Sequence, residues 1–211
     1  MHIEVVQALR CPSYHPPSWL VARTDAMAAR HIVSGALGCP VCGAEYPIAR
    51  GVVQLGAPIA ASPDDDLGDD AAVRAAALLG LTTPNGVVVL AGAWARHAVE
   101  VAALTEGIHL IALDAPYETP PAGVGVSRVD AGAQLPFGAG AVRGVALDTA
   151  HATAQSLEQA TNALTSGGRL IAPASATMPS KLNSLARDDR WWVAERLAAT
   201  PVVSLGSARR G

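Results

Sequence analysis

The stretch Gly86-Val87-Val88-Val89-Leu90-Ala91-Gly92-Ala93-Trp94-Ala95-Arg96 decides the fold of this chain. Residues 86–90 form a β-branched, apolar run without polar alternation, which is typical of a strand buried on both faces of a sheet. After the glycine at position 92, an apolar stripe follows at helical spacing, at Ala95, Val99, Ala102 and Ala103. The stretch therefore predicts a strand, a glycine turn and a helix.

The same alternation of strand and helix continues on both sides of this stretch. Apolar runs predict further strands at 109–113, 124–129, 142–147 and 169–172, and helical stripes predict helices at 71–79 and 154–164. Beyond Pro179 we expect one more helix and a short strand at 202–205. Such alternation predicts the α/β class, with a parallel sheet and crossover helices on both faces.

Composition limits the classes of function. The 211 residues are 50% hydrophobic and 16% charged, as in a globular protein with a sizeable core. No apolar run reaches the roughly 18 residues of a membrane span, and the first residues lack a signal segment. We therefore expect a cytoplasmic protein without membrane contact. A net charge of −3 gives no reason to expect nucleic-acid binding.

Composition also divides the chain. Residues 1–57 hold all three cysteines and many prolines and glycines. Residues 58–70 include the acidic run Ala61-Ser62-Pro63-Asp64-Asp65-Asp66-Leu67-Gly68-Asp69-Asp70, which lacks periodicity and is interpreted as a mobile linker. Residues 71–211 form the expected α/β domain.

The first segment carries a candidate metal site at Cys11, His15, Cys39 and Cys42. Structural zinc is held by a closed tetrahedron of thiolate and imidazole ligands. The second pair, Cys39-Pro40-Val41-Cys42, has the spacing of a zinc knuckle, and so small a module gains much of its stability from a metal. The alternative is that Cys11 and His15 are unrelated surface residues and that the other two are free thiols. His31 is a reserve ligand.

This segment resembles the zinc-ribbon activator subunit of tRNA and translation-factor methyltransferases. The resemblance rests on Leu9-Arg10-Cys11-Pro12, on residues 31–48 around the second cysteine pair, and on Gly51-Val52-Val53. The family usually begins with C-P-x-C, whereas this chain has Tyr14 where the second cysteine belongs. His15 must then substitute as the ligand. The resemblance implies that the ribbon packs against the α/β domain or against a second copy of the chain.

Residues 86–174 resemble class I S-adenosylmethionine-dependent methyltransferases, which implies a Rossmann-like fold. Asp114 closes the second strand, where the family binds the ribose hydroxyls of its cofactor. Asp130, within Val129-Asp130-Ala131, stands where an acid meets the adenine amino group. Residues 163–170 resemble the turn into the fifth strand. The resemblance implies an S-adenosylmethionine site that contains Gly92, Asp114 and Asp130.

The first motif of that family departs most from its pattern here. The family has an acid and three glycines, and this chain keeps Gly92 but has Leu90, Trp94 and Arg96 at the other positions. A carboxylate that would hold the cofactor's ammonium is missing, and hydrogen bonds to charged groups contribute about 1.5–3 kcal/mol each. We expect Trp94 either to fill the emptied pocket or to be a large core residue.

No catalytic residue is predicted. Asp148-Thr149-Ala150-His151 follows the fourth strand, where an imidazole and a carboxylate could act as base and orienter. We favour the alternative that Asp148 or Thr149 caps the next helix and that His151 is exposed in its first turn. Trp191 and Trp192 are interpreted as core residues that close over the last strand, with a contact patch as the alternative.

Two functions remain in competition. The altered first motif favours a non-catalytic methyltransferase-fold protein whose zinc ribbon is an interaction module for a protein partner or a homodimer. The retained acids Asp114 and Asp130 favour the alternative, an active methyltransferase that binds S-adenosylmethionine through an altered motif.

Overall fold

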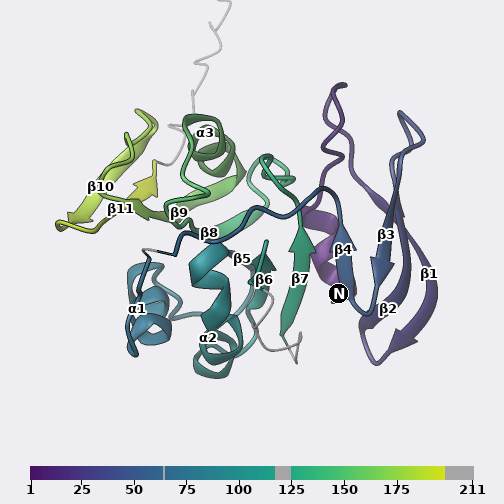
Figure 1. The fold of residues 1–211 in the computed structure, drawn as a ribbon, viewed down its shortest axis with the longest axis horizontal. Helices are drawn as coiled ribbons and strands as arrows, with labels where there is room; N and C mark the ends of the chain where they lie inside the picture. Colours follow the sequence, from purple (N-terminus) through teal and green to yellow (C-terminus); the bar gives the residue numbers. More distant parts are fainter. Residues whose placement is uncertain (64, 117–124, 198–211) are drawn as a thin grey trace, which may run out of the picture.

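The computed structural model describes residues 1–63, 65–116 and 125–197. Within these ranges eleven strands form one sheet in the order β1-β2-β3-β4-β7-β6-β5-β8-β9-β11-β10 (Figure 1). The first strands are β1 (Val21–Ala28), β2 (His31–Gly38), β3 (Glu45–Ala49) and β4 (Val52–Gln54). The others are β5 (Val87–Ala91), β6 (His109–Leu113), β7 (Val126–Asp130), β8 (Val142–Ala146), β9 (Leu164–Pro173), β10 (Leu182–Arg187) and β11 (Trp191–Arg196).

The predicted α/β fold is confirmed. Strands β7, β6, β5, β8 and β9 are parallel neighbours, and counted from β5 they have the order 3-2-1-4-5 of the doubly wound nucleotide-binding sheet. Every residue of β5 is buried, as its apolar sequence predicts. In the part of the chain that the structure describes, three α-helices accompany the sheet: α1 (Ala71–Leu78), α2 (Ala98–Leu104) and α3 (Ala154–Ala163).

The prediction of a helix beyond Pro179 is wrong, because β10 and β11 form an antiparallel hairpin there. Trp191, Trp192 and Val193 are buried in β11, which pairs antiparallel with β9. Aromatic and β-branched residues fit the pleated surface of a sheet, and their burial against β9 stabilises the strand. The strand expected at 202–205 lies outside the described residues.

Two layers of side chains cover the sheet. Helices α1 and α2 pack on one face around Trp94 and Leu90. Helix α3 packs on the other face, together with the 3-10 helix η1 (Ile3–Ala8) from the start of the chain (Figure 1). Helices thus cover both faces, as predicted, with η1 supplied by the N-terminal segment.

The N-terminal strands continue the central sheet. β4 pairs in parallel with β7, so that Val52, Val53 and Gln54 lie opposite Arg128, Val129 and Asp130. This pairing covers an edge that would otherwise expose unpaired backbone groups. The cysteine-bearing segment therefore packs directly against the α/β part, which is one of the two arrangements expected from the sequence.

The expected linker follows a defined path. Residues 55–63, which we name the crossing segment, run from β4 towards α1 past the ends of the central strands (Figure 1). The backbone amides of Leu55 and Gly56 both donate to the carbonyl of Asp130, at 2.7 and 3.0 Å. Within the predicted linker of residues 58–70, the backbone amide of Ile59 donates to Asp114 at 3.2 Å and that of Ser62 donates to Asp148 at 3.3 Å, contacts that a mobile linker would lack.

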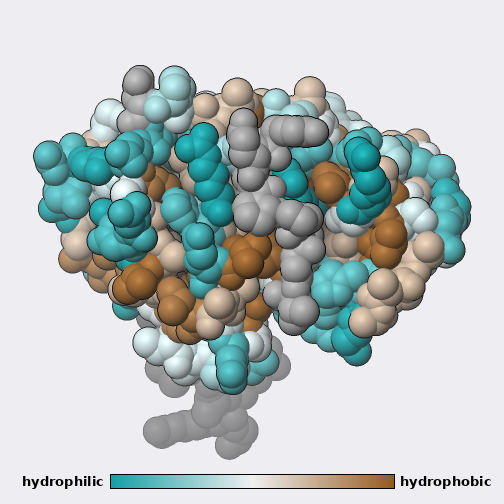
Figure 2. Space-filling model, turned by 60° about the horizontal axis from the view of Figure 1, so that its bottom comes forward, coloured by the Kyte–Doolittle hydropathy of each residue, from teal (hydrophilic) through white to brown (hydrophobic). Residues whose placement is uncertain are grey.

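The surface mixes polar and apolar residues. Figure 2 shows hydrophobic residues lying among hydrophilic ones on the side that faces the viewer. Among the described residues, no helix is long and apolar enough to cross a membrane.

Candidate functional site

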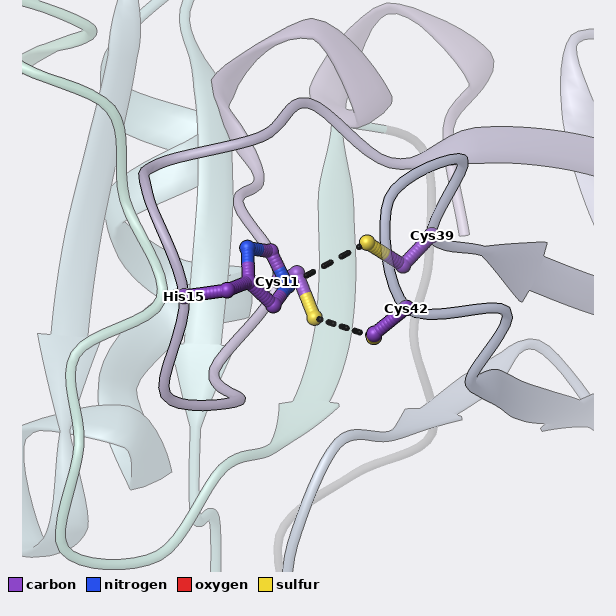
Figure 3. A group of neighbouring side chains, drawn as sticks. All are labelled: Cys11, His15, Cys39 and Cys42. Atoms are coloured by element: carbon purple, nitrogen blue, oxygen red, sulfur yellow. Dashed lines mark hydrogen bonds between the residues drawn. The ribbon is translucent and has the colours of Figure 1, made fainter.

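The structure brings together all four predicted metal ligands. Cys11 lies after η1, His15 lies on the following loop, and Cys39 and Cys42 lie on the turn between β2 and β3 (Figure 3). Their ligand atoms all lie within 4.8 Å of one another. The Sγ atoms of Cys11 and Cys42 are 3.8 Å apart, and Cys39 Sγ is 3.4 Å from His15 Nε2.

These separations fit a tetrahedral ion. Zinc–sulfur and zinc–nitrogen bonds of about 2.3 and 2.0 Å place neighbouring ligand atoms about 3.5–3.8 Å apart. The Nδ1 of His15 is 2.6 Å from the carbonyl of Pro16, a contact that leaves Nε2 directed at the cysteines. Metal-binding histidines usually make such a second hydrogen bond. The cluster can therefore hold a metal ion.

Neighbouring groups favour the thiolate form of two of the three cysteines. Burial raises the pKa of the Cys11 thiol, but hydrogen bonds from Tyr46 and Ser13 outweigh this effect and lower that pKa to about 6. Burial likewise raises the pKa of Cys39, and the backbone amides of Cys42 and Val41 outweigh it. For Cys42 the backbone amide of Ala44 lowers the thiol pKa, but burial and the neighbouring thiols outweigh it and raise that pKa. Tyr46, whose hydroxyl lies 3.1 Å from Cys11 Sγ, was not predicted from the sequence.

The predicted cofactor residues lie at the carboxyl ends of neighbouring strands. Gly92 follows β5, Asp114 follows β6 and Asp130 ends β7. Ligands of open α/β sheets bind at this edge. Asp130 is half-buried, and burial and the charge of Asp114 raise its pKa. Gly92 has φ +58°, and a Cβ at this position would collide with the carboxylate of Asp148.

A buried histidine joins two carboxylates at the same edge. His151 is 2% exposed, and its Nδ1 donates to Asp148 at 2.5 Å while its Nε2 donates to Asp114 at 3.3 Å. Burial lowers the pKa of His151, but the hydrogen bonds to Asp114 and Asp148 outweigh it and raise that pKa to about 9.

The interpretation of His151 as an exposed residue of a helix is therefore wrong. Thr153 caps α3, with its Oγ1 accepting from the backbone amide of Ser156 at 3.1 Å. Asp148 instead accepts from the amide of Ala93 at 2.9 Å. The signal that could have revealed this network is the spacing of Asp148 and His151, three residues apart after a buried strand.

The crossing segment is hydrogen-bonded to the carboxylates at this edge. The backbone amide of Ile59 donates to Asp114 at 3.2 Å, and that of Ser62 donates to Asp148 at 3.3 Å. Beyond the segment, Asp65 accepts from both the amide and the hydroxyl of Thr149, at 2.7 and 2.8 Å.

Two glycines allow the crossing segment to approach the sheet closely. A Cβ at Gly56 would lie 2.6 Å from the carbonyl oxygen of Ala131, and one at Gly132 would lie 2.6 Å from that of Ala57. The amides of Ala131 and Gly132 also donate to Asp114, at 2.7 and 3.1 Å. The lone pairs of Asp114 are thus largely engaged within the protein.

Trp94 does not occupy this edge. It is fully buried in the core beneath α1 and α2, where its ring lies edge-on to Trp191 at 5.2 Å between centroids. Trp192 is 1% exposed and donates from Nε1 to the carbonyl of Ala176 at 2.9 Å. The core interpretation of the three tryptophans is therefore confirmed.

The chemistry open to the network is limited. A histidine whose two nitrogens both donate to carboxylates, and whose pKa is about 9, is protonated near neutral pH and cannot accept a substrate proton. A hollow of about 360 Å³ remains beside Asp114, between the crossing segment and Arg96. It is at the small end of the range for ligand sites.

Comparisons with known proteins concern the fold. No protein-family model matches the chain, and no curated protein sequence matches it. A geranyl diphosphate methyltransferase in complex with SAM is 16% identical, with a TM-score of 0.41 over 55% of this chain and 60% of that chain. The antibiotic-resistance methyltransferase Kmr is 16% identical, with a TM-score of 0.43 over 67% of this chain and 100% of that chain.

A putative methyltransferase, yhhF from Escherichia coli, is 14% identical, with a TM-score of 0.42 over 68% of this chain and 92% of that chain. This chain spans 60% of the length of the geranyl diphosphate methyltransferase. The strand order and pairing make the chain an α/β protein with a mixed sheet, and the structural neighbours named here carry methyltransferase names.

Proposed function

We propose that this protein is a non-catalytic methyltransferase-fold protein that acts in binding or assembly, with a zinc-bound ribbon as its interaction module. One observation carries the proposal. Asp114 and Asp148 lie at the edge of the sheet where the fold would hold a cofactor. Their carboxylates accept hydrogen bonds from the backbone amides of Ile59 and Ser62 in the crossing segment. The protein's own chain makes the hydrogen bonds that a ligand's hydroxyl groups would need.

The core supports the same proposal. Leu90 is fully buried at the position where the resembled family has an acid. Trp94 stands where that family has a glycine, and its large side chain is fully buried in the core. A cofactor would have to displace the crossing segment and would still lack an anchor for its ammonium. Loss of two charge-assisted contacts weakens binding by about a hundredfold or more.

Zinc is the metal that the ribbon cluster fits best. Three thiolates and one imidazole in a closed tetrahedron are a common structural zinc set. The loop around the cluster also exposes apolar residues: Tyr14 is fully exposed, Trp19 is 49% exposed and Val41 is 60% exposed. Aromatic residues are enriched in protein interfaces, and these side chains support contact with a protein partner or a second copy of the chain.

Calorimetric titration with S-adenosylmethionine tests the proposal. We expect no heat of binding in the micromolar range for the full chain, while a catalytically active methyltransferase measured in parallel binds. Micromolar binding, or cofactor retained through purification, would overturn the proposal.

The alternative is an active S-adenosylmethionine-dependent methyltransferase. The hollow beside Asp114 favours it, because residues 58–61 of the crossing segment line that hollow and their displacement would enlarge it. In that case Asp114→Asn should reduce the micromolar binding of the cofactor, since the ribose hydroxyls would lose a charged acceptor and one of its two oxygens. Asp25→Asn, at an exposed acid on β1, is the control and should leave binding unchanged.

A further inference from the structure

Three imidazoles and one carboxylate meet at the opposite end of the strands from Asp114. His109 is the first residue of β6 and His31 is the first residue of β2. His2 and Glu4 come from the N-cap and first turn of η1. Segments that are far apart in the sequence therefore each contribute a group with metal-binding chemistry.

The groups are close enough to share one ion. The Oε2 of Glu4 lies 2.8 Å from Nε2 of His109, and the His2 ring stacks on the His109 ring with 4.3 Å between centroids. One ligand atom from each of His2, Glu4 and His109 lies within 4.8 Å of the other two. The His31 ring meets that of His2 edge-on at 5.1 Å.

Hydrogen bonding within the protein leaves part of this cluster unexplained. Nδ1 of His109 and Nε2 of His31 are buried and have no hydrogen-bond partner among the described residues.

We propose that His2, Glu4 and His109 form a second metal site, which takes a divalent first-row transition metal ion such as Ni²⁺ or Zn²⁺. Two imidazoles and one carboxylate form a ligand set of the kind that such ions prefer. The 2.8 Å between the ligand atoms of Glu4 and His109 fits adjacent positions around an ion with bonds of about 2.0 Å. Glu4 is partly exposed, and its other carboxylate oxygen, Oε1, pairs with the exposed guanidinium of Arg30, which leaves Oε2 for the ion.

Such an ion would connect η1 to β6. The backbone amide of His2 already donates to the buried hydroxyl of Ser127 in β7 at 2.9 Å, so the start of η1 is fixed against the sheet. A bound ion would add a cross-link between the cysteine-bearing segment and the α/β part at this end of the strands. This site is independent of the Cys11 cluster and of the cofactor edge.

Calorimetric titration of the full-length protein with Ni²⁺, with elemental analysis of the product, tests the proposal. We expect one Ni²⁺ per chain with micromolar affinity, in addition to any metal already present in the cysteine cluster. His109→Ala and Glu4→Gln should each weaken that binding at least tenfold. Glu4→Gln keeps the shape of an exposed side chain, so it remains informative if His109→Ala unfolds the protein.

His97→Ala is the matched control. Nδ1 of His97 lies 2.9 Å from Oε2 of Glu100, which gives a histidine–carboxylate pair of the same kind without a second imidazole in contact. This variant should bind Ni²⁺ as the wild type does. Absence of saturable Ni²⁺ binding, or equal uptake by the wild type and both cluster variants, would overturn the proposal and leave a purely structural cluster.

Discussion

The backbone amide of Ile59 donates a hydrogen bond to the side chain of Asp114, which lies 55 positions later in the chain, at 3.2 Å. Asp114 is 2% exposed and follows β6 at the edge where nucleotide-binding sheets hold their ligands. The acid that the sequence assigns to a cofactor is therefore already bound by the protein.

Asp65 should fix the end of the crossing segment. Asp65→Ala removes two hydrogen bonds to Thr149 and leaves a donor without its partner, which should lower the free energy of unfolding by about 1–3 kcal/mol. Urea denaturation measures the change. Asp66→Ala is the neighbouring control, since Asp66 is exposed and accepts from the amide of Gly68 nearby in the sequence. Equal losses in the two variants would contradict a specific role for Asp65.

The cysteine cluster should contain one zinc ion per chain. The variant Cys39→Ser, Cys42→Ser removes two of four ligands and should lose the metal and melt at a lower temperature, because so small a module depends on its ion. Elemental analysis and thermal unfolding measure both effects. Ser34→Ala on β2 is a control outside the cluster. A metal-free wild type with the same melting curve as the double variant would refute the prediction.

His151 should make stability depend on pH. Its pKa is about 9 in the folded protein and about 6.5 when unfolded, so its stabilising effect is complete below about pH 6.5 and is lost as pH rises through 9. The difference corresponds to a contribution on the order of 3 kcal/mol. Urea denaturation between pH 6 and pH 10 should show this loss in the wild type.

His151→Gln should remove that pH dependence and lower stability most at pH 6. His97→Gln is the control, because His97 lies near the surface beside Glu100. The pH effect attributed to His151 is the part of the change in unfolding free energy that is lost in His151→Gln but kept in His97→Gln. If the wild type has the same unfolding free energy at pH 6 and pH 9, His151 is not held as a charged group.

Gly92 should be intolerant of any side chain. Gly92→Ala places a Cβ at a position with φ +58° and against the carboxylate of Asp148. Gly140 has a comparable φ of +66°, but a Cβ added there would contact no other atom. Gly140→Ala therefore measures the cost of the backbone conformation alone, about 1–2 kcal/mol. Gly92→Ala should cost about 1–3 kcal/mol more, as measured by thermal unfolding. Equal destabilisation by the two substitutions would argue against the close approach to Asp148.

The sequence by itself determined the local elements of the α/β part. The continuous β-branched, apolar run of β5 and the period-3.6 stripe of α3 are patterns that residues near one another in the chain impose. The candidate ligands Cys11, His15, Cys39 and Cys42 could also be predicted from the sequence, because each pair is local and cysteine and histidine are typical metal ligands. The β10–β11 hairpin was missed, since burial of Trp191 and Trp192 against β9 decided it.

Only the tertiary structure decided what lies at the carboxyl edge. The pairing of β4 with β7, the contacts of Ile59 and Ser62, and the burial of His151 between Asp114 and Asp148 all join residues far apart in the sequence. An acidic segment without periodicity gives no sign of where its backbone amides will find acceptors. The physical reason is that such hydrogen bonds form wherever the packed sheet leaves a buried carboxylate unpaired, and that location is a property of the whole fold.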